Sequence, residues 1–343
     1  MRCIDLPGNE RRMEMRLAPI RLIAVVLMYV CWLTAAGAQP TMKVFRIGVL
    51  GTVPPSEPAT ARIWSGLFEE LRQLGYVEGE NFIVESRYTE GRSERLPTLA
   101  AELVQLKVDV IVAAALTAEA AKSATSTIPI VMANHGDPLS SGLVVSLAKP
   151  GGNVTGMSTL ALDLVGKQIQ LLKEVMPQLS HVAVLSNAAN PNHPARVSQA
   201  EMAARVLKVR LQALEVRAPT DLEGAFAAAR RESAEALLVL GDAMLFGERT
   251  RIVELAAQSR LPLMGTQSEF PEAGALLAYG TDQRDSFRRA AIYVDKILKG
   301  AKPANLPVEQ ARKFELIVNM KAAKRLGMTI SPTVLARADR VIE

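Results

Sequence analysis

Few side chains in this sequence stand at the spacings that known catalytic, metal-binding and phosphate-binding motifs require. The nucleophile elbow G-x-S-x-G and the zinc motif H-E-x-x-H do not occur, and neither do the phosphate-binding patterns G-x-x-x-x-G-K-S/T and G-x-G-x-x-G. Of the three histidines, only His135 stands close to another potential ligand, Asp137, and two ligands do not make a metal site. We therefore predict no catalytic residue, no metal and no cofactor.

Candidate binding residues are indicated by their position instead. Apolar runs that have the character of buried strands end in small or polar residues, and in open α/β sheets ligands bind beyond the carboxyl ends of the strands. Backbone N–H groups at the starts of the following helices favour an anionic group such as a carboxylate. We predict a ligand site made of Thr52, Ser56, Ala115, Thr117, Asp137, Asn187, Asn190, Asp242, Gln267 and Tyr279.

An amino-acid head group would use this arrangement in a definite way. Its carboxylate would meet hydroxyls and N–H groups of the first half of the chain. Its ammonium would need Asp137 or Asp242, because a desolvated cation without an anionic partner is costly. The alternative is that both aspartates are helix caps or turn residues, which is the commoner role of an aspartate after a strand. The aromatic residues nearest the strand ends are Phe246, Phe270 and Tyr279.

The elements that must position these residues alternate regularly. Short apolar runs are followed by amphipathic helical stretches, the pattern of βαβ units and a parallel sheet. The pattern ends near residue 136 and restarts at residue 181, which predicts two doubly wound α/β lobes. The expected strands are FRIGVL (45–50), NFIVESRY (81–88), VDVIVAA (108–114) and IPIVMA (128–133), then HVAVLSN (181–187), VRLQALEV (209–216), EALLVLGD (235–242) and LPLMGT (261–266).

Two further segments concern the connection between the lobes. The stretch DPLSSGLVVSLAKPGGNVTGMS (137–158) combines glycine and proline turn residues with a short β-prone run, so we interpret it as a joint. The tail adds a strand (274–282), a helix striped by apolar residues up to Leu298, and another strand (313–319). This tail suggests that the chain passes back and forth between the two lobes.

Composition excludes some classes of partner. The 343 residues are 49% hydrophobic and 22% charged, with a formal net charge of +5, an ordinary globular balance. Basic residues form no stripe interleaved with aromatics, so we predict no nucleic-acid partner.

The first forty residues have the pattern of an export signal. Four arginines between positions 11 and 21 precede the apolar run LIAVVLMYVCWL (22–33) and a possible cleavage site, Ala36-Gly37-Ala38. That run is short of the ~20 residues that a membrane span needs. We predict a signal peptide over residues 1–38 and a periplasmic protein, with an uncleaved anchor as the alternative. Both cysteines, Cys3 and Cys31, would be removed with the signal.

In chain order the sequence contains the segments RIGVL, GLFEELRQLGYVEGENF, the stretch 137–158, EAGALLAYGTD, RRAAIYVDKILKGAKPANLPVEQ and KFELIVNMKAAKRLGM. Together, and in this order, they resemble the ABC-transporter substrate-binding family related to tryptophan/tyrosine transport binding proteins. The resemblance implies a type I periplasmic-binding fold with three crossovers and the ligand in the cleft between two lobes. The crossovers would be Gly152 to Ser158, Leu277 to Asp282 and Leu306 to Phe314. Lobe one would then comprise 39–152 with 283–306, and lobe two 153–282 with 307–343.

The expected function follows from this resemblance. We expect a monomeric periplasmic protein that binds a small organic solute, such as an amino acid or related carboxylate, and delivers it to an inner-membrane ABC permease by hinge closure. Two alternatives belong to other classes: a periplasmic sensing module that serves a receptor, and an enzyme with its active site between the lobes. We predict that the protein is not an enzyme.

Overall fold

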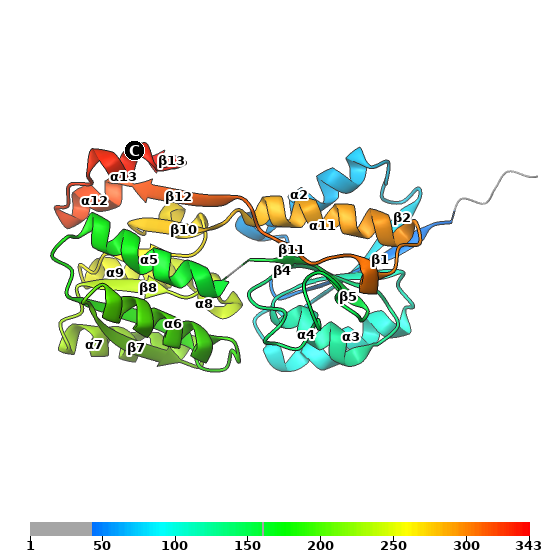
Figure 1. Ribbon diagram of the computed structural model, residues 1–343, viewed down its shortest axis with the longest axis horizontal. Coiled ribbons are helices and arrows are strands. Elements are labelled where there is room, and N and C mark those ends of the chain that lie inside the picture. Colours follow the sequence, from blue (N-terminus) through cyan, green and yellow to red (C-terminus); the bar gives the residue numbers. More distant parts are fainter. Residues whose placement is uncertain (1–42, 160) are drawn as a thin grey trace, which may run out of the picture. The chain divides into compact units, whose positions relative to one another are not determined.

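The computed structural model describes residues 43–159 and 161–343 (Figure 1). The predicted signal peptide, residues 1–38, lies outside the described residues. Within the described ranges, no helix is both long and apolar enough to cross a membrane. Two β-sheets with helices on their faces form the two predicted lobes.

The first lobe is built on a six-stranded parallel sheet with the strand order β11-β5-β4-β3-β1-β2. Helices α2 and α11 cover one face and α3 and α4 the other (Figure 1). The central strands β1 and β3 are continuous apolar runs because both of their faces are covered. The bounds are β1 Phe45–Gly51, α2 Pro58–Gln73, β2 Phe82–Tyr88, α3 Leu96–Gln105, β3 Val110–Ala114, α4 Leu116–Ala124, β4 Ile130–His135, β5 Val154–Ser158, α11 Gln283–Leu298 and β11 Glu309–Gln310, with short 3-10 turns at Ser93–Arg95 and Pro303–Asn305.

The second lobe contains a seven-stranded sheet with the order β13-β12-β10-β9-β8-β6-β7, in which only the β10–β12 pair is antiparallel among the described strands. Helices α5, α6 and α12 pack on one face, and α7, α9 and α10 on the other. The bounds are α5 Ala161–Val175, β6 His181–Asn187, α6 His193–Val206, β7 Arg210–Val216, α7 Leu222–Arg231, β8 Ala236–Val239, α8 Ala243–Gly247, α9 Arg249–Gln258, β9 Leu263–Gly265, α10 Glu269–Ala273, β10 Leu277–Thr281, β12 Phe314–Asn319, α12 Met320–Leu326, α13 Pro332–Ala336 and β13 Arg340–Ile342, with a 3-10 turn at Pro219–Asp221.

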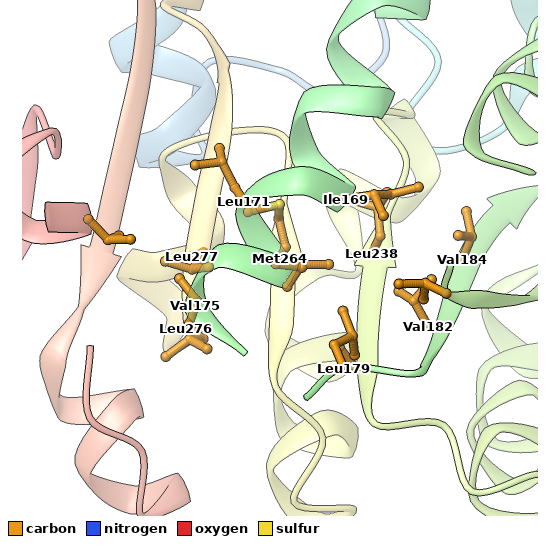
Figure 2. Packing of buried hydrophobic residues seen from close by; sticks show 14 of the residues in the cluster. Ile169, Leu171, Val175, Leu179, Val182, Val184, Leu238, Met264, Leu276 and Leu277 are labelled. Carbon is orange, nitrogen blue, oxygen red and sulfur yellow. The ribbon is translucent and has the colours of Figure 1, made fainter. Parts of the chain in front are cut away.

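Each lobe has its own apolar core. In the second lobe, Ile169 and Val175 of α5 lie against the sheet residues Leu238, Met264 and Leu277, and all of these side chains are buried (Figure 2). Full burial of one such side chain contributes roughly 1.5–3 kcal/mol. A closely packed core resists deformation, so we expect the lobes to move as units about the connections between them.

The chain passes between the lobes three times: after β5, after β10 and after β11. The first passage differs from our boundary at residue 152, because β5 pairs with β4 in the first sheet and the lobe extends to Ser158. The third passage follows Gln310 rather than residue 306, because β11 pairs with β5. The glycine-rich turn indicated that a strand follows, but turn residues carry no information about which sheet that strand joins.

The second and third passages are joined by an ion pair. Asp282 caps the N-terminus of α11 by accepting from the backbone N–H of Asp285 (3.0 Å). The other oxygen of Asp282 accepts from Nζ of Lys313 at 2.6 Å. Hydrogen bonding from Lys313 and from backbone N–H groups lowers the pKa of Asp282 against the opposing effect of burial. The carboxylate therefore stays ionised and ties the two passages together.

Candidate functional site

A cavity of about 210 Å³ lies between the two lobes. In the first lobe its lining comes from the loop after β1, the first turns of α2 and α4, and the end of β4. In the second lobe it comes from the ends of β8 and β9 and from α5 and α6. These are the carboxyl ends of parallel strands, where α/β sheets bind ligands. The volume suits a small solute.

Three aromatic side chains lie on the cavity walls. Trp64 of α2 and Phe287 of α11 pack edge to face with their ring centres 4.8 Å apart. Phe246 of α8 lines the second-lobe side, and the Arg249 guanidinium carbon lies 4.7 Å from its ring centre. All three rings are buried against their own lobes. They offer apolar surface on which a planar group of a solute could pack.

The first turn of α4 provides polar backbone groups. Ala115 precedes this helix with φ of 48°, a left-handed conformation that costs about 1–3 kcal/mol in a residue other than glycine and that clusters at ligand clamps. The following residues Leu116 and Thr117 line the cavity, and N–H groups in a first helical turn have no partner within the helix. The Thr117 hydroxyl is already engaged, because its single hydrogen lies within reach of the carbonyl oxygens of Leu50 and Ala114 and its oxygen accepts from the Ala114 N–H.

Asp242 is the acidic group on the second-lobe wall. Its carboxylate caps α8 by accepting from the N–H groups of Met244 (2.9 Å) and Leu245 (3.2 Å). It also accepts from the side-chain amides of Asn187 (3.1 Å) and Asn190 (2.8 Å). Four donors therefore satisfy this buried carboxylate within the second lobe.

His193 lies beneath this wall as a neutral ring. Its Nδ1 accepts from the backbone N–H of Asn187 at 2.8 Å, so Nε2 carries the hydrogen and faces the Gly241 carbonyl oxygen at 3.3 Å. Burial, followed by the nearby positive charge of Arg196, lowers the pKa of His193 to about 4. The ring therefore adds no positive charge to the cavity at neutral pH.

Arg196 of α6 is the cationic side chain on the second-lobe wall. Its Nη1 donates to the Gly241 carbonyl oxygen at 2.7 Å. Over residues 43–159 and 161–343, the structure shows no carboxylate within 4.0 Å of this guanidinium. Its Nη2 faces Gly136 of the first lobe, where a Cβ atom would lie only 2.2 Å away. Arg196 therefore reaches from the second lobe to the backbone of the first.

Two sets of ion pairs join the lobes around the cavity, and we call them the interlobe pairs. Glu57, which caps α2 through the Thr60 N–H (2.8 Å), pairs with Arg249. Arg62 pairs with Glu269 (2.7 Å) and Glu272 (2.9 Å) of α10. A separate hydrogen bond joins the Asn192 amide to Glu119 of α4 at 3.2 Å, and hydrogen bonding from His135 lowers the pKa of Glu119.

Comparison with known proteins identifies the family. Residues 46–342 match the family described as ABC transporter substrate binding protein. The chain belongs to this family. A tyrosine-binding protein of Clostridioides difficile is 26% identical over 273 residues, which are 79% of this chain and 78% of that protein.

Solved structures agree with this assignment. A conserved domain protein from Vibrio cholerae is 31% identical, with a TM-score of 0.82 over 87% of this chain and 100% of that chain. An ABC domain from Streptococcus pneumonia in complex with L-Trp is 27% identical, with a TM-score of 0.81 over 88% of this chain and 100% of that chain. This substrate-binding protein therefore has the type I periplasmic-binding fold that the sequence led us to expect.

The structure brings six of the predicted site residues to the cavity of this substrate-binding protein and leaves four away from its lining. Ser56 is exposed, and Asp137 folds onto its own loop by accepting from the N–H groups of Leu139 and Ser140. Asn187 lies behind Asp242, and Tyr279 stacks on Phe314 at the hinge. The residues on the lining are Thr52, Ala115, Thr117, Asn190, Asp242 and Gln267.

Sequence analysis missed several lining residues. Trp64 and Phe287 belong to apolar helical stripes, which the sequence assigns to the core, and both are indeed core residues that also face the cavity. Arg196 and Gln168 lie inside helices, whereas the strand-end rule considered only the loops. A rule that included the first turn of each following helix would have found Arg196.

The protonation of His193 is directly testable. In an NMR pH titration of the folded protein, we expect one of the three histidines to titrate near pH 4 and the variant His193→Gln to lack that signal. Because the folded ring binds a proton less readily than the unfolded one, its contribution to stability is complete above the ordinary value of 6.5 and is lost as the pH falls toward 4. A sample unfolded in urea is the control, and a folded His193 midpoint near 6.5 would contradict the prediction.

Proposed function

We propose that this substrate-binding protein takes up a small amino-acid-like solute with a planar apolar side chain and delivers it to an ABC permease. The observation that supports the proposal best is the composition of the cavity between the lobes. Trp64, Phe287 and Phe246 contribute apolar side chains to its lining, whereas Arg196 and the first turn of α4 contribute polar and charged groups. The carboxylate and the aromatic side chain of such a solute would each find complementary surroundings.

The relatives add independent support for this class of solute. One is a tyrosine-binding protein, and another was crystallised with L-Trp. Both solutes combine an amino-acid head group with an aromatic ring. The predicted site residues Thr52, Ala115, Asn190 and Gln267 are proposed to contact the solute, because they line the same cavity.

Delivery would depend on hinge closure. Solute that contacts both lobes binds the closed arrangement more tightly than the open one, and this difference shifts the population toward closure. A permease would recognise the outer faces of both lobes in that arrangement. We propose that the protein acts as a monomer in the periplasm after export, and that it performs no chemistry on its solute.

A thermal-shift screen tests the proposal. L-tryptophan, L-tyrosine and L-phenylalanine are compared with aliphatic amino acids, sugars and small dicarboxylates. A solute at a hundredfold its dissociation constant should stabilise the protein by ~2.7 kcal/mol, which is a shift of several degrees for a chain of this size. Stabilisation by sugars alone would contradict the proposed class of solute.

A further inference from the structure

This inference deepens the proposed function and rests on it. Arg196 differs from the other arginines around the cavity in having no acidic partner. Arg249 pairs with Glu57, and Arg62 pairs with two glutamates. Among the described residues, the guanidinium of Arg196 donates one hydrogen bond, from Nη1 to the Gly241 carbonyl oxygen. A charge placed in a protein interior is normally paired, because desolvation without a partner is costly.

The acidic groups nearest to Arg196 are committed elsewhere. Asp242 accepts hydrogen bonds from four donors of its own lobe. Asp137 accepts from the N–H groups of Leu139 and Ser140 and from the Ser140 hydroxyl. Burial lowers the pKa of Arg196, and the charges of Asp242 and Asp137 partly oppose this effect. An arginine keeps its proton in any such setting, so the cavity wall carries a positive charge without a direct partner.

The position of the guanidinium gives it access to a bound solute. Both Arg196 and Gly136 line the cavity, and Nη2 occupies the space that a side chain at position 136 would fill. Nη1 is held by the Gly241 carbonyl, whose second donor is the neutral ring of His193. One edge of the guanidinium is thus fixed to the second lobe while the other edge lies between the lobes.

We propose that Arg196 is the anchor for a carboxylate of the solute and the residue that selects solutes carrying one. A guanidinium presents its donors in a planar fork that matches a carboxylate, and charge-assisted hydrogen bonds of this kind are about twice as strong as neutral ones. The sequence had placed the carboxylate against hydroxyls and N–H groups of the first lobe. With Arg196 as the anchor, the carboxylate is bound where the two lobes meet.

The first experiment compares matched solutes on matched variants. Affinities of L-tryptophan and L-tyrosine are measured by calorimetry beside tryptamine and tyramine, which lack the carboxylate. In Arg196→Gln we expect the affinity for the amino acids to fall about 30-fold or more, because removing one member of a desolvated charge pair costs at least ~2 kcal/mol. Arg205→Gln removes the same charge from an exposed position on the same helix and should leave affinity unchanged.

A second variant tests the geometry without removing the charge. Gly136 does not require a left-handed backbone, and the atom nearest to a new Cβ is the flexible end of Arg196 at 2.2 Å, followed by the Cβ of Ala161 at 3.3 Å. Gly136→Ala should therefore fold normally, displace the guanidinium and weaken binding of the amino acids. In the Arg196→Gln background the same substitution should change the affinity much less, because the guanidinium that it would displace is absent.

The outcomes separate the anchor from the proposed function. Tryptamine binding as tightly as L-tryptophan, or unchanged amino-acid affinity in Arg196→Gln with an unchanged melting temperature, overturns the anchor and leaves solute binding intact. Binding of sugars but of no carboxylate overturns the anchor and also contradicts the proposed class of solute. Failure of every solute in the screen to bind contradicts both the anchor and the proposed function.

Discussion

Replacing Gly156 with alanine is expected to destabilise the first lobe by about 2–6 kcal/mol, the sum of backbone strain and overpacking. Gly156 has φ of 129° in the middle of β5, and a Cβ there would lie 2.2 Å from the carbonyl oxygen and 2.7 Å from the nitrogen of Met132. Met132 belongs to the neighbouring strand β4, so the clash is with backbone that cannot turn aside. The two strands would have to separate.

Gly224→Ala is the matched control for this prediction. Gly224 lies in helix α7 with nothing within 4 Å of a new Cβ, and its backbone is not left-handed. Alanine is preferred to glycine in a helix by roughly 0.5–1 kcal/mol, so this variant should be as stable as the original or slightly more stable. Urea unfolding followed by circular dichroism measures both variants. A change of less than about 1 kcal/mol in Gly156→Ala would show that β4 and β5 adapt more easily than close packing implies.

The same close approach occurs where the chain leaves the second lobe. Gly280 lies in β10, just before the second passage, and a Cβ there would lie 1.9 Å from the carbonyl oxygen of Thr266. Two of the three strands that lead into the passages thus contain a glycine pressed against neighbouring backbone. Backbone packed this closely restricts the direction in which the chain leaves each sheet.

The sequence predicted the central strands well because they are buried on both faces. Runs such as FRIGVL and HVAVLSN carry the apolar composition that a covered parallel strand requires, and both are strands in the structure. The boundary between the lobes was predicted less well. Strand β5 and the two-residue strand β11 join the first sheet, and the choice of sheet is made by contacts with distant residues.

Prediction of the candidate site from the sequence was limited in a similar way. The rule that ligands bind at strand ends selected Thr52 and Asp242, and both lie on the cavity lining. It could not show that the donors around Asp242 come from its own lobe, because Asn187 and Asn190 lie more than fifty positions away in the chain. Nor could it show that Arg196 lacks a carboxylate partner. Whether a charge is paired depends on tertiary contacts, and these decide which groups are left for a solute.

The second large prediction is that the interlobe pairs contribute to solute affinity rather than to the stability of either lobe. Glu269 is buried, with a side chain 5% exposed, and its partner Arg62 is 42% exposed. Arg249 is 16% exposed and also lies over Phe246 on the cavity wall. These contacts join the two lobes, so they stabilise the arrangement in which the lobes meet and have no counterpart when the lobes are apart. Each therefore contributes to the free energy of closure.

Hydrogen bonds keep the acidic partners ionised. Burial opposes ionisation of Glu57, but hydrogen bonds from Thr60 and Arg249 lower its pKa below the ordinary value of 4.5. Burial likewise opposes ionisation of Glu272, and hydrogen bonds from Arg62 and Arg340 lower its pKa below the same value. The contribution of these carboxylates to closure is complete above pH 4.5 and is lost as the pH falls through their lowered values. Closure should thus be insensitive to pH near neutrality but sensitive to salt, which screens charges that water can reach.

The double variant Arg62→Ala, Arg249→Ala removes both sets of interlobe pairs. We expect the affinity for the best solute of the screen to fall about 30-fold, or ~2 kcal/mol. This value is smaller than the usual cost of breaking a buried pair, because Arg62 is partly exposed and water screens its charge.

The matched control is Arg251→Ala, Arg284→Ala, which removes the same charge from the intralobe partners Glu223 and Glu69. Its affinity should stay within about twofold, since exposed pairs within one lobe contribute little. Calorimetry measures the affinities, and small-angle X-ray scattering with solute present measures the fraction of closed protein. Equal affinities in the two double variants would show that the solute alone drives closure and that the interlobe pairs form at no net gain in free energy.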